Sequence, residues 1–193
     1  MLNQLFQNRH LILASGSPRR KSILKDLGLE FEIRIKEVDE SYPTSLKGKE
    51  ISEYLAKLKA SPFVEELQKN EILITADTIV WLEGQALGKP KNKEEASQML
   101  RSLSNKTHEV ISSIALTTAH QQIIISDNTK VTFKKLSDKE INYYIDHFKP
   151  FDKAGAYGIQ EWMGYIGIQR IEGSYFNVVG LPVQKLYEAL HEL

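Results

Sequence analysis

Apolar runs rich in β-branched residues alternate with helical patterns through the first half of the chain. Residues 11–14 are apolar throughout, as expected of a buried strand. Ser17 and Pro18 suit the N-cap and the first position of a helix, and Gly28 suits its C-terminal stop. The order of strand, tight loop and helix predicts an α/β fold with some parallel strand pairing.

A second helix is predicted over about residues 49–63, because apolar residues from Ile51 to Leu58 recur with the spacing i, i+3, i+4, i+7. Lys59 lies at the border of that apolar stripe, whereas Lys57 projects away from it. Lys59 is therefore the better placed of the two lysines to reach from the helix surface into a cleft.

Residues 71–81 have the pattern of a strand that Asp77 interrupts. The first half of this strand is apolar on both faces, as expected where helices cover a sheet on two sides. Further strands are predicted at residues 110–116, 123–125, 131–133 and 165–171.

Two pairs of residues have the spacing of a capping box at the start of a helix. They are Asn92 with Glu95, and Ser137 with Glu140. The helices that they open are expected to end near residues 103 and 147, and a closing helix follows Pro182. Together these elements predict an α/β fold with a mixed sheet flanked by helices, in two lobes with a central cleft. We expect a single domain over residues 1–193, with residues 1–10 as an N-terminal extension.

The composition is that of a globular protein, with 41% apolar and 26% charged residues. The 25 basic residues balance the 25 acidic ones, so no global field favours nucleic acid or an anionic membrane. A bound anion must therefore be held by a local cluster. The chain has no cysteine, which excludes disulfide scaffolds, thiolate metal sites and cysteine nucleophiles.

Neither a signal peptide nor a membrane span is evident. Residues 1–10 lack the continuous apolar centre of a signal peptide, and no run of about 18 apolar residues occurs. Both features favour a cytoplasmic protein with no membrane partner.

Residues 14–20, Ala-Ser-Gly-Ser-Pro-Arg-Arg, lie between a predicted strand and the first turn of a helix. Small residues such as Ser15 and Ser17 let the backbone approach an anion, and the helix start presents free N–H groups. Arg19 and Arg20 add charge and forked donors. The segment is neither a Walker loop nor a dinucleotide fingerprint. It predicts either a phosphate cradle or an ordinary capped helix with solvated arginines.

This segment is the first of an ordered series of motifs that covers nearly the whole chain. The others are Val-Asp-Glu at 38–40, Lys-Ala at 59–60, Ala-Asp-Thr-Ile-Val at 76–80, Gly-Lys-Pro at 88–90, Val-Thr-Phe at 131–133, Asp-Lys-Ala-Gly-Ala-Tyr-Gly-Ile-Gln at 152–160 and Gly-Leu-Pro at 180–182. The series resembles the Maf family of nucleotide pyrophosphatases.

The resemblance implies hydrolysis of nucleoside triphosphates to the monophosphate and pyrophosphate, dependent on a divalent metal, in a protein that is often a homodimer. The motif at 152–160 ends in Tyr-Gly-Ile-Gln at 157–160. This ending resembles that of the family branch that acts on dTTP and UTP more than that of the branch that acts on methylated GTP. Because the family is also associated with blocking septum formation in bacteria, a non-catalytic nucleotide-binding regulator of cell division is the alternative. Zero net charge and the lack of a basic stripe count against a nucleic-acid partner.

A triphosphate carries about four negative charges, so its pocket should bring several cations together with a metal. Without the resemblance, Lys59 has the pattern of an ordinary surface lysine. With it, the residues implied to face the phosphates are Arg19, Arg20, Lys59 and Lys89, with Ser15 and Ser17 in the substrate-binding loop.

Asp77 is the candidate catalytic residue. It follows a run too apolar for a solvent-facing strand, so we expect its carboxylate at a strand end above the cleft. There it orients or deprotonates the attacking water, or binds the metal, and the resemblance favours the general base. The alternative is a strand-ending aspartate that accepts backbone hydrogen bonds.

Glu40 belongs to an acidic run whose default interpretation is a solvated loop. The resemblance implies that Glu40 helps to hold Mg²⁺ or Mn²⁺, hard cations that prefer oxygen ligands. Asp77 is the second candidate ligand. The five histidines show no paired spacing typical of a zinc site.

The resemblance implies that Asp152, Lys153 and Gln160 belong to the nucleotide pocket. There the Gln160 amide can form hydrogen bonds with the edge of a pyrimidine base. The alternative is a loop shaped only by its turn geometry. Thr78 either contacts the ligand or simply fills its strand.

Trp81 and Trp162 are candidates for stacking on a base, although buried packing is the commoner role of such residues. Glu161 and Trp162 follow Gln160 where a small, glycine-rich continuation is usual in the family. We expect these two side chains to narrow or reshape the base pocket.

Overall fold

The computed structural model describes residues 8–193, so most of the predicted N-terminal extension lies outside the described residues. His10, its last residue, already begins the first strand. The strands are β1 (His10–Leu13), β2 (Glu32–Ile33), β3 (Glu71–Leu82), β4 (Gln85–Leu87), β5 (Thr107–Thr117), β6 (Gln122–Phe133) and β7 (Ile168–Glu172). The helices are α2 (Pro18–Asp26), α3 (Lys49–Ala60), η1 (Ser61–Glu66), α4 (Lys93–Leu103), α5 (Asp138–Phe148), η2 (Ala154–Ala156), α6 (Trp162–Gly167), α7 (Tyr175–Val179) and α8 (Val183–Glu192).

These strands form one mixed sheet in the order β2-β1-β3-β5-β6-β7, and β4 pairs with β3 off this path. β1 is parallel to both β2 and β3, whereas the other pairs are antiparallel. The mixed α/β sheet predicted from the sequence is therefore confirmed.

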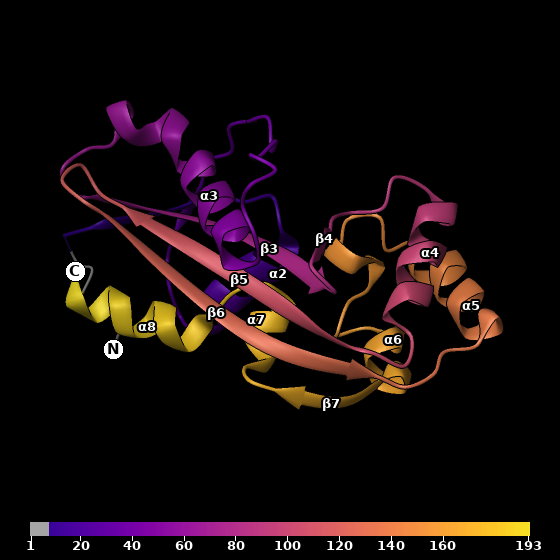
Figure 1. Cartoon of the computed structure of the whole chain (residues 1–193). Coiled ribbons are helices and arrows are strands. Elements are labelled where there is room, and N and C mark those ends of the chain that lie inside the picture. The colour runs from indigo at the N-terminus through magenta and orange to yellow at the C-terminus, as the bar shows by residue number, and fades with distance from the viewer. Residues whose placement is uncertain (1–7) are drawn as a thin grey trace.

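β1 and the first half of β3 are buried on both faces, as their continuous apolar sequences predict. Leu11 and Leu13 belong to the core beside α2 and α8, while Ile12 points to the opposite face and packs with Leu73 and Phe63. Figure 1 shows α3 on one face of the sheet and α7 and α8 on the other. Helices on both faces exclude water from the parallel part of the sheet.

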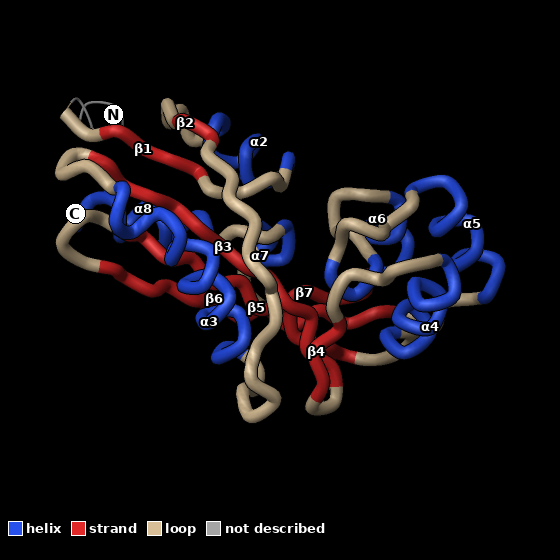
Figure 2. The backbone as a smooth tube through the Cα atoms, turned by 90° about the horizontal axis from the view of Figure 1, so that it is seen from above, coloured by secondary structure: helices blue, strands red, loops and turns tan. Residues whose placement is uncertain are grey.

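A second group of elements, α4, α5, α6 and η2, lies beyond the far end of the long strands (Figure 2). Its core contains Leu100, Tyr144 and Met163, which pack against Phe133 of β6 and Val80 of β3. This arrangement confirms the two predicted lobes, one on the parallel part of the sheet and the other at the end of its antiparallel strands.

The predicted helix starts are confirmed, with one difference in capping. At α5, Ser137 and Glu140 form a complete capping box. At α4, the Asn92 side chain accepts from the Glu95 N–H, but the Glu95 carboxylate accepts from the N–H of Lys91 instead of Asn92. Within residues 8–193, no helix is both long enough and apolar enough to cross a bilayer.

The predicted strands at residues 123–125 and 131–133 are wrong as separate elements, because they are parts of the single strand β6. The polar stretch between them pairs continuously with β5, Ser126 opposite Ser113 and Asn128 opposite Ile111. Most of β6 up to residue 128 is only partly buried, so polar residues are compatible with a strand there, and the apolar pattern does not reveal it.

Two further boundaries differ from the predictions. The helix predicted over residues 49–63 ends at Ala60, and η1 follows with Pro62 in its first turn, where proline lacks the N–H that a continuing α-helix needs. The strand predicted over residues 165–171 is the helix α6 followed by β7. A Cβ on Gly164 would lie 1.9 Å from the carbonyl oxygen of Ile159, so α6 depends on a close backbone approach that no periodicity shows.

Candidate active site

A solvent-open cleft lies where β1 leaves the side of β3. β1 pairs with β3 only as far as Leu13, opposite Ile74, and β4 joins the same edge of β3 at Val80. Between these points no described strand covers that edge. The cleft has a volume of about 590 Å³ and is open to solvent. The gap in the sheet places Asp77 and Thr78, in the middle of a buried strand, at the wall of a cavity.

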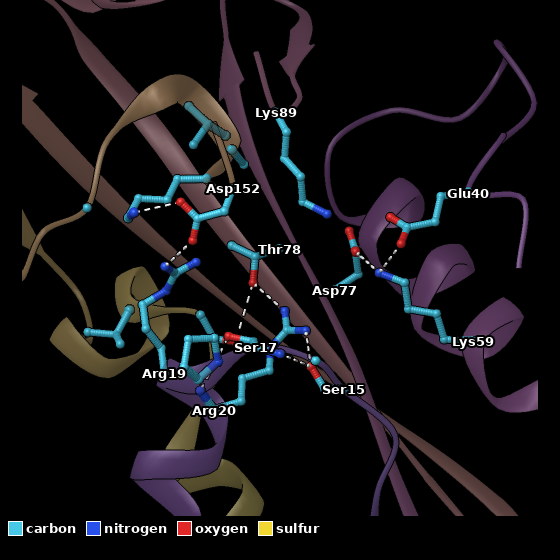
Figure 3. Close-up of a pocket in the computed structure, with 18 of the residues that line it drawn as sticks. Ser15, Ser17, Arg19, Arg20, Glu40, Lys59, Asp77, Thr78, Lys89 and Asp152 are labelled. Carbon is cyan, nitrogen blue, oxygen red and sulfur yellow. Dashed lines mark hydrogen bonds and ion pairs between the residues drawn. The ribbon is translucent and has the colours of Figure 1, made fainter. Parts of the chain in front are cut away.

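The structure brings together in this cleft every residue predicted to bind substrate or metal, and Figure 3 shows most of them. They come from both lobes, and the roles assigned to them individually stay predictions. They are Ser15, Ser17, Arg19, Arg20, Glu40, Lys59, Asp77, Thr78, Lys89, Asp152, Lys153 and Gln160.

The loop at residues 14–17 leads directly into the N-terminus of α2. The Ser17 hydroxyl accepts from the backbone N–H of Arg20 and caps the helix, and Pro18 occupies its first position, as predicted. The backbone N–H of Ser17 donates to the Ser15 hydroxyl at 3.3 Å. These contacts hold the positive end of the helix dipole beside the cleft, where it favours an anion.

Arg20 is partly buried and makes four hydrogen bonds within the protein. Its Nε donates to the carbonyl of Gly180 (2.9 Å), Nη1 to the carbonyl of Ala76 (2.8 Å) and the hydroxyl of Ser15 (3.3 Å), and Nη2 to the hydroxyl of Thr78 (3.1 Å). Burial lowers the pKa of Arg20, and the charge of Asp77 opposes this effect. The side chain thus covers part of the open edge of β3 and leaves one of its five N–H donors for a ligand.

The Thr78 hydroxyl makes its hydrogen bonds to other residues of the protein. Because a guanidinium only donates, the Thr78 hydroxyl accepts from Arg20, and it lies 2.8 Å from the hydroxyl of Ser112. Ser112 in turn donates to the carbonyl of Asn177. The Thr78 hydroxyl therefore donates either to Ser112 or to the carbonyl of Gly180 at 3.4 Å, and Thr78 orients Arg20 more directly than it can donate to a ligand.

Arg19 has a different environment, although it is the neighbour of Arg20. Its Nη1 lies 3.1 Å from Oδ2 of Asp152, which belongs to the loop after α5, so this ion pair crosses the cleft between the lobes. Burial opposes ionisation of Asp152, but hydrogen bonds from Lys153 and Arg19 outweigh it and hold its pKa below the ordinary value. Arg19 is accordingly held by one exposed carboxylate that a phosphate can replace.

Lys59 extends from the last turn of α3 into the cleft, whereas Lys57 is exposed, which confirms the choice between them. The Lys59 Nζ atom lies 2.6 Å from Oδ1 of Asp77 and 3.2 Å from Oε1 of Glu40. One ammonium therefore lies between two carboxylates that would otherwise repel each other. Figure 3 shows this group at one side of the cleft and Asp152 with Arg19 at the other.

Lys89 lies on the loop between β4 and α4. Of the cations that line the cleft, Lys89 is the only one without an ion pair or side-chain hydrogen bond within the described part of the chain. Its side chain is directed into the cleft towards Asp77 (Figure 3). Lys89 is therefore available to an anionic ligand without breaking a contact.

Lys153 is buried, and its ammonium lies 2.7 Å from Asp152 and 2.9 Å from Glu161. Gln160 is exposed at the rim of the cleft. Its backbone carbonyl accepts from the Tyr165 hydroxyl at 2.7 Å, while its side-chain amide makes no hydrogen bond to any described residue. The amide is therefore available to a ligand.

Glu40 and Asp77 offer oxygen donors for a hard divalent cation on either side of the Lys59 ammonium. In residues 8–193 no three His, Asp or Glu side chains come close enough together to hold a metal. Mg²⁺ is commonly bound by one or two carboxylates together with substrate phosphates. The two carboxylates thus fit a cation that arrives with a polyphosphate better than one held by the protein alone.

At the base pocket, the two tryptophans do not take the stacking role, and the two residues after Gln160 do not narrow the cleft directly. Neither Trp81 nor Trp162 lines the cleft, and Trp162 packs instead against Tyr143 with ring centroids 4.8 Å apart. Glu161 does not enter the cleft either, because its carboxylate contacts Lys153 from behind. Glu161 and Trp162 therefore do not narrow the pocket with their own side chains.

The sequence analysis missed the apolar wall of the cleft. This wall has the signal of an ordinary hydrophobic core, since its residues lie in buried strands, in α7 or just after η2. No periodicity distinguishes a core position from one at the edge of a cavity. The wall includes Val80, Val110, Tyr157, Ile159, Val178 and Val179.

The model of one family, described as "Maf-like protein", matches residues 10–193. The chain belongs to the Maf family. Among curated relatives, the dTTP/UTP pyrophosphatase of Flavobacterium psychrophilum is 58% identical over 187 residues, which cover 97% of this chain and 96% of the relative. That of Flavobacterium johnsoniae is 56% identical over 193 residues, all of both chains. A solved structure, the nucleoside-triphosphatase / dITP/XTP pyrophosphatase of Mycobacterium abscessus, matches over 95% of each chain with 14% identity and a TM-score of 0.46.

In this Maf family member, most of the motifs that carried the resemblance converge on the cleft. The exception is residues 131–133, at the end of β6. Phe133 packs there edge to face against Tyr157 and His108. That motif supports the cleft from the second lobe and does not line it.

Proposed function

We propose that this Maf family member hydrolyses dTTP and UTP to the nucleoside monophosphate and pyrophosphate. The observation that carries the proposal is the convergence of one carboxylate, Asp77, with Arg19, Lys59 and Lys89 in a single solvent-open cleft. The two Flavobacterium relatives that match almost the whole chain carry the name of this activity.

The phosphates bind at the start of α2, where Arg19 exchanges Asp152 for a phosphate and Lys89 adds its free ammonium. Arg20 contributes mainly by shaping this end of the cleft, because four of its N–H groups are already used. Together with the helix dipole, these groups offset the roughly four negative charges of the triphosphate.

Asp77 aligns and deprotonates the attacking water. Its Oδ1 is held by Lys59, while Oδ2 has no hydrogen-bond partner among the described residues. In the step, the water oxygen bonds to the α-phosphorus, the bond from that phosphorus to the bridging oxygen breaks, and the electron pair leaves with pyrophosphate. The proton of the water passes to Asp77. Such positioned base catalysis typically contributes about 10²–10⁴-fold.

Lys59 and Lys89 stabilise the negative charge that develops on the leaving pyrophosphate, which is the main catalytic contribution available to the protein in phosphoryl transfer. Mg²⁺ or Mn²⁺, with Glu40 and Asp77 as the ligands that the chain offers, supplies further positive charge at the phosphates when bound.

The nucleoside binds against the apolar wall, where the Gln160 amide meets the pyrimidine edge and Lys153 lies beside it. The homodimer and the cytoplasmic location implied by the resemblance stay predictions. Light scattering and cell fractionation test them.

The test is pyrophosphate release from dTTP, UTP, CTP, ATP and GTP in the presence of Mg²⁺ or Mn²⁺. We expect the highest kcat/KM with dTTP and UTP. Asp77→Asn should lower kcat by about 10²–10⁴-fold and still bind dTMP. Asp146→Asn is the control, because Asp146 is an exposed residue of α5 that pairs with Lys93.

Absence of pyrophosphate release with every nucleotide would contradict the proposal and favour the nucleotide-binding regulator. Full turnover by folded Asp77→Asn would show that another group is the base.

A further inference from the structure

Behind the cleft, polar side chains form a continuous series of contacts between the lobes. The Tyr144 hydroxyl contacts Oε2 of Glu161, and Oε1 of Glu161 lies 2.9 Å from Nζ of Lys153. That ammonium lies 2.7 Å from Oδ1 of Asp152, whose Oδ2 pairs with Arg19. The series runs from the core of the second lobe to the N-terminus of α2, and Glu161 joins Tyr144 to Lys153 within it.

The donors and acceptors in this series follow from the chemistry of the groups. An ionised carboxylate only accepts, so the Tyr144 hydroxyl donates to Glu161. The backbone N–H of Gly158 donates to the same hydroxyl oxygen at 3.0 Å. Burial raises the pKa of Tyr144, and Glu161 adds to this effect, so the phenol keeps its proton. Glu161 is thus coupled through Tyr144 to the backbone of the segment that ends in Gln160.

Glu161 also packs directly on this segment. A Cβ on Gly158 would lie 2.9 Å from Cδ of Glu161 and 3.1 Å from Cε of Lys153, so both side chains close over the backbone two residues before Gln160. The Lys153 side chain is only 9% exposed and that of Glu161 26%. Removal of Glu161 would leave the shielded Lys153 ammonium with one carboxylate, that of Asp152, in place of two, and a loss of this kind is costly where water cannot replace the missing partner.

We propose that Glu161 is a positioning residue that sets the nucleoside affinity and base preference of the cleft by fixing Lys153 and the segment that carries Gln160. The proposal rests on the proposed function. Glu161 itself does not line the cleft, so its effect on a ligand passes through these neighbours. It occupies the position where the sequence departs from the small residues expected after Gln160.

The experiment compares Glu161→Ala with the wild type for dTTP and CTP turnover and for binding of dTMP and inorganic pyrophosphate. We expect Glu161→Ala to raise the Kd of dTMP and the KM of dTTP by about tenfold. The Kd of pyrophosphate and the kcat for dTTP should stay close to those of the wild type. The preference for dTTP over CTP, measured as the ratio of kcat/KM values, should fall.

Two conservative variants separate the two contacts of Glu161 and cover the case in which Glu161→Ala does not fold. Glu161→Gln keeps an acceptor for Tyr144 but removes the charge that pairs with Lys153. Tyr144→Phe keeps the ion pair but removes the hydroxyl between Glu161 and Gly158. Each should show a smaller loss of dTMP affinity than Glu161→Ala. Glu188→Ala, at an exposed position of α8, is the matched control and should behave as the wild type.

An unchanged dTMP affinity and dTTP-to-CTP ratio in folded Glu161→Ala would overturn the proposal. An equal loss for pyrophosphate and dTMP would overturn it as well, since that would show general damage to the cleft. If the wild type releases no pyrophosphate from any triphosphate, the proposed function fails, and the comparison of dTMP with pyrophosphate binding still decides the role of Glu161.

Discussion

The Nζ atom of Lys59 lies 2.6 Å from Oδ1 of Asp77, across the boundary between α3 and the middle of β3. The same ammonium lies 3.2 Å from Glu40. Lys59 therefore holds one oxygen of the candidate base in place and separates it from the second carboxylate. This contact links the orientation of the base to the position of the helix that covers the sheet.

Removing the Lys59 ammonium should have opposite effects on catalysis and on cation binding. In Lys59→Met we expect kcat/KM to fall by about 10²-fold, because a preorganised positive charge is lost. Mn²⁺ should bind more tightly in the absence of nucleotide, because Glu40 and Asp77 lose the cation that competes for them. Calorimetric titration with Mn²⁺ measures this. Lys57→Met is the control, and an unchanged Mn²⁺ affinity in Lys59→Met would argue against a cation site at the two carboxylates.

Replacing each of the two adjacent arginines by lysine should lower the free energy of unfolding by different amounts. Arg20→Lys loses the fork that joins Ala76, Gly180 and Thr78, and we expect the free energy of unfolding to fall by about 2 kcal/mol. Arg19→Lys disturbs only a partly exposed ion pair, so its cost should stay below about 1 kcal/mol. Urea denaturation gives both values, and equal losses in the two variants would contradict this division.

Gln160→Ala should alter the choice of base more than the affinity for phosphate. The amide has no partner within the described chain, so its removal costs the fold little. We expect kcat/KM for dTTP to fall by about tenfold, as for the loss of one hydrogen bond to the ligand, with smaller changes for the other triphosphates. Specificity constants for all five nucleotides test this. The same loss with every nucleotide would exclude a role in base recognition.

The stability of the fold should fall in mild acid because of His108. This residue is buried against Phe133 and Tyr157, and burial lowers its pKa from 6.5 to about 4. Between these two values the unfolded chain binds a proton at His108 that the folded chain does not bind. The free energy of unfolding therefore decreases as the pH falls from 6.5 towards 4, by about 3 kcal/mol in total.

Urea denaturation at several pH values between 7.5 and 4.5 measures this slope. His108→Gln should flatten it, whatever its effect on stability at neutral pH. His120→Gln, at an exposed position in the turn between β5 and β6, should keep the wild-type slope. An identical slope in His108→Gln and the wild type would assign the acid sensitivity to other groups.

Several elements and the composition of the cleft could be predicted from the sequence. Ser17 and Pro18 determine the start of α2 because the cap and the proline act on the backbone next to them. The continuous apolar runs of β1 and β3 require cover on both faces, which a helix-flanked sheet provides. Lys59 and Asp77 could be selected for similar local reasons, from a helical stripe and from a polar residue that interrupts a buried strand.

Only the tertiary structure decided how these residues are used. Arg19 and Arg20 have the same side chain and adjacent positions, yet Arg20 is held by Ala76 and Gly180, while Arg19 reaches Asp152 in the other lobe. Tertiary contacts also decided the conformation of the helix around Gly164, the pairing of the polar middle of β6 and the contacts of Glu161 behind the cleft. In each case the deciding partner is distant along the chain or makes a close backbone approach, and packing sets its position. Local periodicity contains no information about such partners.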